Sequence, residues 1–170
     1  MKQYYILPLL IILTACSKKE ATEAPFDAFV YSFSDSQNNF SIKFTSGDTV
    51  YMQKRQGLLK KNFYALTKRP DKDSIIALTG KVDFTAYEKN PEAPKAKDGV
   101  AIKFYTIKDG KERSVYVFSG SDSEKLFPLA VKFTEFAKRF DFQPTDTKVD
   151  LGNLEHIELP PTPAFPEPVK

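Results

Sequence analysis

The sequence predicts an α+β domain in which an antiparallel meander sheet and a β-hairpin carry two helices packed on one face. Several short segments alternate apolar and polar residues with the period of two that is typical of half-buried strands. An Asp-Gly pair at residues 109–110 separates two such segments, as in a tight hairpin. Two longer segments carry apolar residues at helical spacing. Strands and helices are grouped rather than regularly alternating, which favours an antiparallel sheet.

The first strands are expected in residues 29–33, 40–45 and 49–53. The segments FVYSF and FSIKFT place every second, mostly aromatic, residue on a common face. The turn-forming clusters DSQNN and SGD separate the three strands, so a meander is predicted. Residues 62–67, NFYALT, are expected to form a fourth strand.

The hairpin is expected in residues 100–120, with a two-residue turn that needs positive φ at both central positions. With that turn, apolar side chains face each other on one side of the hairpin. The predicted pairs are Lys108–Lys111, Phe104–Val115, Ile102–Val117 and Lys103–Tyr116.

Two helices are expected, in residues 71–84 and 121–140. Asp71 is predicted to cap the first helix. The second begins at Ser121 with the spacing of a capping box and carries a broad apolar stripe. Pro128 is expected to start or to kink it.

The amino-terminal end has the order of an export signal. Lys2 precedes an apolar run at residues 6–15, which is too short to cross a bilayer as a helix, since that takes roughly 20 residues. The run ends in Leu13-Thr14-Ala15-Cys16, which resembles the lipobox of bacterial lipoproteins. The resemblance implies a signal peptide cleaved after Ala15 and a diacylglycerol, with palmitate among its acyl chains, on the thiol of Cys16.

Cys16 is the sole cysteine of the chain, so an exported protein offers it no disulfide partner, which favours acylation over an ordinary secretory signal or a short buried strand. Ser17 in place of aspartate resembles the sorting pattern for the outer membrane, with the domain facing the periplasm. The chain as a whole resembles small envelope lipoproteins of Bacteroidota. The predicted layout is a signal peptide at 1–15, an acylated cysteine and tether at 16–25, one domain at 26–159 and a Pro-rich disordered tail at 160–170.

Few residues suggest catalysis. One histidine, His156, and one acylated cysteine cannot supply a nucleophile–base pair or a transition-metal site, so no catalytic, cofactor-binding or metal-ligating residues are expected. Acidic pairs at Asp71/Asp73 and Asp146/Asp150 leave a carboxylate-dependent hydrolase open as an alternative.

Two features suggest binding. The basic stretch between Thr49 and Pro70 contains no acidic residue and is a candidate contact for an anionic lipid surface, or else a solvated strand edge. Tyr105 and Tyr116 share a hairpin face and could form a platform for a sugar or peptide, or could belong to the core. The basic candidates are Lys54, Arg55, Lys60, Lys61, Lys68 and Arg69.

Thr49 and Ser74 each follow an aspartate and precede an apolar residue. This pattern resembles the O-glycosylation sites of exported Bacteroidota proteins, although a turn and a helix cap explain both positions equally well.

The sequence therefore predicts a lipid-anchored, non-catalytic envelope protein that binds another envelope protein or a glycan. The alternatives are a tethered inhibitor of a lysozyme or protease and a carboxylate-dependent envelope hydrolase. A net charge of +3 on an exported chain is a poor match to nucleic acid, and no nucleic-acid partner is expected.

Overall fold

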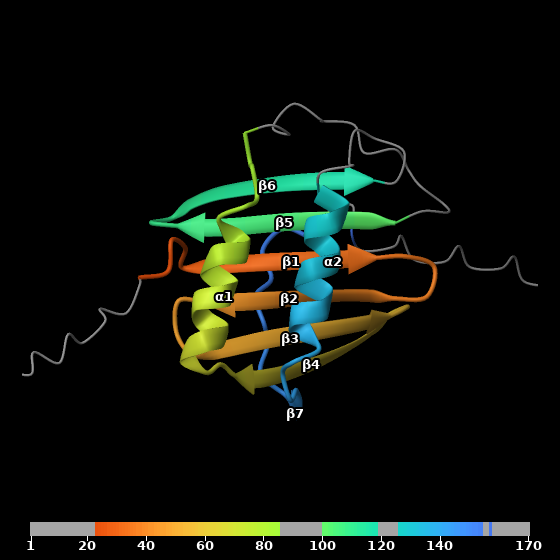
Figure 1. Cartoon of the computed structure of the whole chain (residues 1–170). Coiled ribbons are helices and arrows are strands. Elements are labelled where there is room, and N and C mark those ends of the chain that lie inside the picture. Colours follow the sequence, from red (N-terminus) through yellow and green to blue (C-terminus); the bar gives the residue numbers. More distant parts are fainter. Residues whose placement is uncertain (1–22, 86–99, 119–125, 155–156, 158–170) are drawn as a thin grey trace, which may run out of the picture.

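In the part of the chain that the structure describes, one antiparallel sheet forms the centre and two helices lie across one of its faces (Figure 1). The structure, a computed structural model, describes residues 23–85, 100–118, 126–154 and 157. The predicted α+β class and the antiparallel sheet are confirmed. The strands are β1 (Ala28–Ser34), β2 (Asn39–Thr45), β3 (Thr49–Gln56), β4 (Leu59–Leu66), β5 (Ala101–Lys108), β6 (Lys111–Phe118) and β7 (Gln143–Thr145), and the helices are α1 (Arg69–Thr79) and α2 (Leu126–Ala137).

The strand order is β6-β5-β1-β2-β3-β4-β7. Strands β1 to β4 are neighbours in chain order, and the β5–β6 hairpin joins the sheet beside β1. Strand β1 therefore has a strand on each side. It is also covered on both faces, which explains why Phe29, Val30 and Tyr31 are all buried.

The β5–β6 register is the predicted one. Asp109 and Gly110 have φ values of 50° and 71°, so both central turn residues lie in the left-handed region. The observed pairs include Lys108–Lys111, Phe104–Val115, Ile102–Val117 and Lys103–Tyr116.

Helix α1 begins and ends earlier than the predicted 71–84. Lys68 is its N-cap, and Pro70 lies in the first turn, where a missing N–H costs nothing. The predicted cap at Asp71 is wrong, because Asp71 lies inside the first turn. Its negative charge there interacts favourably with the positive end of the helix dipole. The helix ends at Gly80, whose N–H donates to the carbonyl of Ile76.

Helix α2 ends at Ala137, earlier than the predicted limit at residue 140. Its expected start at Ser121 lies outside the described residues. Pro128 lies in the first turn of the described helix, where it needs no intrahelical donor. At the other end, the N–H groups of Arg139 and Phe140 bond carbonyls three residues back, which tightens the chain after Ala137.

The core under the helices is aromatic. The ring of Phe133, on α2, stacks on Phe29 at 5.3 Å and on Tyr31 at 5.5 Å, and it tilts against Phe104 at 5.5 Å. The Tyr31 hydroxyl also hydrogen-bonds that of Thr134, at 2.8 Å. Helix α2 is thereby fixed over the centre of the sheet.

The second face of the sheet is crossed by residues 146–154 and Ile157, which we call the C-terminal strap and which run behind the strands in Figure 1. Apolar side chains of the strap and sheet form a small separate core: Val149, Leu151 and Leu154 with Val30, Tyr105 and Ile107. The described residues 146–154 and 157 form no strand. The adjoining short strand β7 was not predicted, because three residues that include Pro144 show no alternation.

The folded domain begins slightly before the predicted boundary at residue 26. Ala24 is already buried in the helix-face core, so the last part of the predicted tether belongs to the domain. No helix in the described ranges has the length and apolar character needed to cross a membrane.

Candidate functional site

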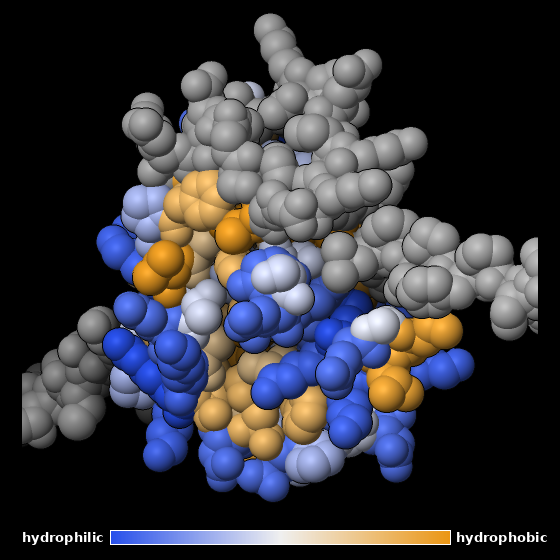
Figure 2. Space-filling view, turned by 90° about the vertical axis from the view of Figure 1, so that its right-hand side faces the viewer, coloured by the Kyte–Doolittle hydropathy of each residue, from blue (hydrophilic) through white to orange (hydrophobic). Residues whose placement is uncertain are grey.

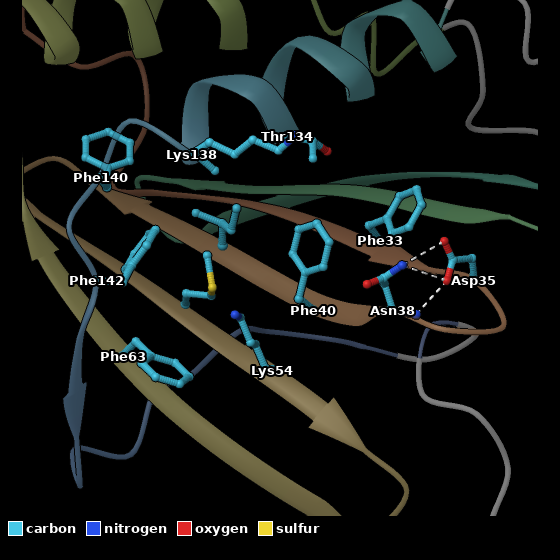
Figure 3. A pocket seen from close by; sticks show the side chains of 13 residues that line it. Phe33, Asp35, Asn38, Phe40, Lys54, Phe63, Thr134, Lys138, Phe140 and Phe142 are labelled. Atoms are coloured by element: carbon cyan, nitrogen blue, oxygen red, sulfur yellow. Dashed lines mark hydrogen bonds between the residues drawn. The ribbon is translucent and has the colours of Figure 1, made fainter.

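A groove of about 560 Å³ opens between α2 and the sheet, near the end at which β1 turns into β2 (Figure 3). It forms because Phe133 fixes α2 over β1 and β5, while the chain after α2 crosses to the far edge of the sheet to form β7. Part of β2, β3 and β4 is left uncovered between these contacts. The groove is lined by Phe33, Asp35, Asn38, Phe40, Ile42, Met52, Lys54, Phe63, Thr134, Ala137, Lys138, Phe140 and Phe142.

The floor of the groove is apolar because of strand alternation. Ile42, Met52 and Phe63 occupy directly paired positions on β2, β3 and β4, so their side chains share one face. Phe140 and Phe142 form one wall, with ring centroids 5.9 Å apart in an edge-to-face arrangement. The result is a surface suited to large apolar or aromatic side chains.

Two lysines border this floor from opposite sides. Lys54, on β3, places its ammonium 5.6 Å from the centroid of the Phe63 ring, and Lys138 follows the last turn of α2 (Figure 3). Lys61 lies opposite Lys54 on β4. Figure 2, which looks onto this end of the sheet, shows hydrophobic patches bordered by strongly hydrophilic side chains. Lys54 and Lys138 outnumber the one carboxylate in the lining, Asp35, so the rim of the groove attracts negative charge.

The acid at the groove, Asp35, is engaged in the β1–β2 turn. One of its carboxylate oxygens accepts the backbone N–H groups of Gln37 and Asn38, and the Asn38 amide also donates to it (Figure 3). Burial acts to raise the pKa of Asp35, but the hydrogen bonds from Asn38 and Gln37 outweigh it and hold that pKa below its usual value. Asp35 therefore stays ionised at neutral pH and holds the turn.

Arg55 is a candidate contact for an anionic surface in the sequence, or else part of a solvated strand edge, and its burial rules out both. Its side chain is only 7% exposed and points to the strap face, because neighbouring strand residues point in opposite directions. It donates to Asn39 Oδ1 at 2.6 Å, Ser41 Oγ at 2.8 Å and Gln53 Oε1 at 3.3 Å. A guanidinium with this coordination stabilises the sheet and is not accessible to a lipid headgroup.

The other basic candidates fall into two groups. Lys54, Lys60 and Lys61 lie around the β3–β4 turn. Lys68 and Arg69 lie beyond the opposite end of β4, where α1 begins. The sequence cluster is therefore not a single surface patch.

The tyrosine platform is wrong for Tyr105, which is 4% exposed and covered by the strap at Gly152. Burial, together with a hydrogen bond and the charge of Glu112, raises the pKa of Tyr105 to about 12. Tyr116 is half-buried. Core packing, the alternative interpretation, accounts for Tyr105.

The structure shows where the two candidate glycosylation residues lie, and it does not test whether they carry a glycan. Thr49 begins β3, and its carbonyl accepts a hydrogen bond from the hydroxyl of Thr45. The hydroxyl of Ser74, on α1, donates to the carbonyl of Pro70 at 2.8 Å. Both sites remain predictions.

Candidate catalytic and metal groups are sparse in the described ranges. No group of three or more His, Cys, Asp or Glu side chains there is arranged to hold a metal ion. Of the two acidic pairs, Asp150 accepts the backbone N–H of Gly152 and so shapes the strap. Cys16 and His156 lie outside the described residues.

The groove was not predicted, although one signal pointed to it. The apolar register of β3 runs through Val50 and Met52 and then reaches Lys54, a charged residue on the core-facing side. A lysine at such a position indicates that the face is open there.

The geometry defines an antiparallel α+β domain with a lysine-bordered aromatic groove on its helix face and a strap on the other. Comparison with protein-family models, with curated proteins and with solved structures finds no match to this chain.

Proposed function

We propose that this chain is a lipid-anchored, non-catalytic protein of the bacterial cell envelope whose groove binds an acidic, apolar segment of another envelope protein. The anchor part of the proposal rests on the lipobox-like Leu13-Thr14-Ala15-Cys16 and on the absence of a second cysteine in the sequence. Two or more acyl chains would make the attachment stable. The sorting pattern at Ser17 favours the outer membrane, with the domain facing the periplasm.

A short tether would keep the domain close to the lipid. The chain from Cys16 to the buried Ala24 extends at most about 27 Å, at about 3.4 Å per residue. A partner of the domain would then be another component of the same compartment.

One observation carries the binding part: an apolar, aromatic floor lies between the ammonium groups of Lys54 and Lys138. The floor suits large hydrophobic side chains, and the lysines suit carboxylates that flank them. A volume of about 560 Å³ is ample for two or three such side chains.

The same observation favours a protein over a glycan. Sugar recognition combines exposed ring faces with hydrogen-bonding groups that meet the sugar hydroxyls. At the centre of this floor, Ile42, Met52 and Phe63 offer no strong donor or acceptor.

Site-specific photocrosslinking tests the groove in the full-length protein, in the bacterium that produces it. A photoreactive phenylalanine analogue at Phe142 should give a discrete crosslinked product, and the same analogue at Val131, exposed on α2, should not. Mass spectrometry should find the captured segment to contain aromatic or aliphatic residues next to Asp or Glu. Equal capture at both positions, or a captured segment without acidic residues, would contradict the proposal.

Charge reversal tests the contribution of the two lysines. Lys54→Glu combined with Lys138→Glu should abolish the crosslink at Phe142. Lys132→Glu, which reverses an exposed charge of α2 that does not line the groove, should leave it intact. A captured lysozyme or protease would identify the module as a tethered inhibitor.

The anchor is tested separately. Labelled palmitate should be incorporated into the wild-type chain and not into Cys16→Ser, and globomycin should block its maturation. Maturation that is unaffected by globomycin would overturn the anchor and leave the groove experiment interpretable on its own.

A further inference from the structure

The turn between β3 and β4 presents two adjacent leucines to solvent. Leu58 is 89% exposed and Leu59 is 67% exposed. Gly57, with φ +57°, makes the tight turn that holds them at the end of the hairpin. We call Gly57, Leu58 and Leu59 the β3–β4 tip. Neighbouring leucines at a protruding tip contribute nothing to the core of their own domain, so they are candidates for contact with an apolar phase outside it.

Lysines flank the tip on both strands. Lys60 and Lys61 follow it directly, and Lys54 lies opposite Lys61 across the hairpin. Among the described residues, two acids lie at the same end of the sheet: Asp35 is engaged in its own turn, and Asp146 follows β7. Apolar tip residues with a modest positive excess behind them complement an anionic lipid surface, because leucine enters the interface while the long lysine side chains reach the headgroups.

The described chain enters the sheet at the end opposite the tip. Strand β1 begins at one end, just after the tether, and the β3–β4 turn lies at the other (Figure 1). The eight residues of β3 span about 26 Å, which is similar to the reach of the tether. A domain lying along the bilayer can therefore have its anchor and its tip at the lipid surface together.

We infer that the β3–β4 tip is a second membrane contact, which inserts Leu58 and Leu59 into the interface of the bilayer while Lys60 and Lys61 meet anionic headgroups. The inference rests on the anchored location in the proposed function but not on the groove. The tip fixes the orientation of the domain on the lipid surface, which a single lipid attachment at Cys16 would not do.

The chain contains no tryptophan, so one introduced indole reports on one position. Leu58→Trp is introduced into the mature-length chain, residues 16–170, in which Cys16→Ser removes the acylation site. Vesicles of phosphatidylcholine with phosphatidylglycerol should shift the indole emission to shorter wavelength, and brominated lipid should quench it. Val131→Trp, at an exposed apolar position of α2, should show neither effect.

Two further variants separate the apolar and electrostatic contributions. Leu58→Ser combined with Leu59→Ser, which leaves the charge of the tip unchanged, should lower vesicle partitioning by roughly tenfold or more, since it removes the apolar contact. Lys60→Glu combined with Lys61→Glu should lower partitioning to anionic vesicles and leave the weak binding to pure phosphatidylcholine unchanged. These residues are exposed, so the denaturation midpoint should match that of the wild type and exclude misfolding.

The inference is overturned if brominated lipid fails to quench the indole of Leu58→Trp, or if it quenches the indoles of Leu58→Trp and Val131→Trp equally. It is also overturned if the emission of Leu58→Trp shifts with protein concentration in the absence of vesicles, because the tip would then contact a second copy of the chain. Retained palmitate labelling and crosslinking at Phe142 would show that such a failure concerns the tip and not the proposed function.

Discussion

Gly152 lies against the ring of Tyr105 so closely that a Cβ at this position would fall inside the van der Waals surface of the ring. Gly152 also has φ +68°, a conformation that L-residues with side chains rarely adopt. The contact joins the strap to β5. At this contact the strap covers the side chain of Tyr105 on the second face of the sheet.

Gly152→Ala should therefore destabilise the domain in two ways. A positive φ costs about 1–2 kcal/mol for a residue with a Cβ, and displacement of the Tyr105 ring should bring the total to about 3 kcal/mol. Denaturant unfolding measures the change. Gly57→Ala is the matched control, because Gly57 has φ +57° and nothing lies within 4 Å of the position that a Cβ would take. Only the conformational cost of about 1–2 kcal/mol should appear there. Equal losses in the two variants would contradict a tight Gly152–Tyr105 contact.

Alkaline pH should weaken the domain through Tyr105. Its pKa is raised to about 12 in the folded state, above the ordinary tyrosine value near 10. The unfolded chain therefore loses this proton first, so the free energy of unfolding is unaffected below about pH 10 and falls as the pH rises toward 12.

Denaturant unfolding of the wild type and of Tyr105→Phe between pH 8 and pH 12 tests this expectation. Above about pH 10, the free energy of unfolding of the wild type should fall relative to that of Tyr105→Phe, because the variant has no proton to lose at this position. A difference that stays constant over the whole range would show that the raised pKa does not contribute to stability.

Removal of the Arg55 side chain should be costly although it lies near a surface turn. Arg55→Ala removes the guanidinium N–H donors of Asn39 Oδ1, Ser41 Oγ and Gln53 Oε1, in a site where Arg55 itself is 7% exposed. The loss of buried, charge-assisted hydrogen bonds should reduce the free energy of unfolding by about 2–4 kcal/mol. Lys61→Ala, an exposed neighbour on β4, should change it by less than about 0.5 kcal/mol. Similar effects at the two positions would place Arg55 at the surface after all.

Phe133→Ala should remove the contact that fixes α2 to the sheet. The side chain is 0% exposed and stacks on both Phe29 and Tyr31. A large-to-small change in such a core costs about 3–5 kcal/mol. Val131→Ala, two residues earlier and 55% exposed, is the control and should stay within about 0.5 kcal/mol. Thermal or denaturant unfolding distinguishes the two, and a small effect of Phe133→Ala would mean that α2 is held elsewhere.

Strands and turns could be predicted from the sequence, because the residue patterns that indicate them lie within a few positions of each other. Alternation predicted β1 and β2 nearly to their ends, and Asp109-Gly110 predicted the register of the β5–β6 hairpin. Helix limits were less accessible, since α1 ends at Gly80 where the apolar stripe itself continues to Val82.

The groove and the burial of Arg55 were not accessible in this way. Arg55 is buried against Asn39, and Asn39 in turn donates to the carbonyl of Ile157, about 100 residues later in the chain. No local pattern distinguishes Arg55 from the exposed Lys54 beside it. The groove depends on where α2 comes to rest over β1 and β5, which follows from long-range packing of Phe133.

By itself, the sequence determined the α+β class and the hairpin register, because both follow from residue spacing along the chain. Acylation of Cys16 rests on a sequence resemblance alone and stays a prediction. Only the tertiary structure decided that the hairpin pairs with β1, that the strap closes the second face and that an apolar groove stays open beside Lys54. The physical reason is that strand pairing and burial depend on which distant surfaces exclude water from each other, and alternation within a segment carries no information about the distant partner.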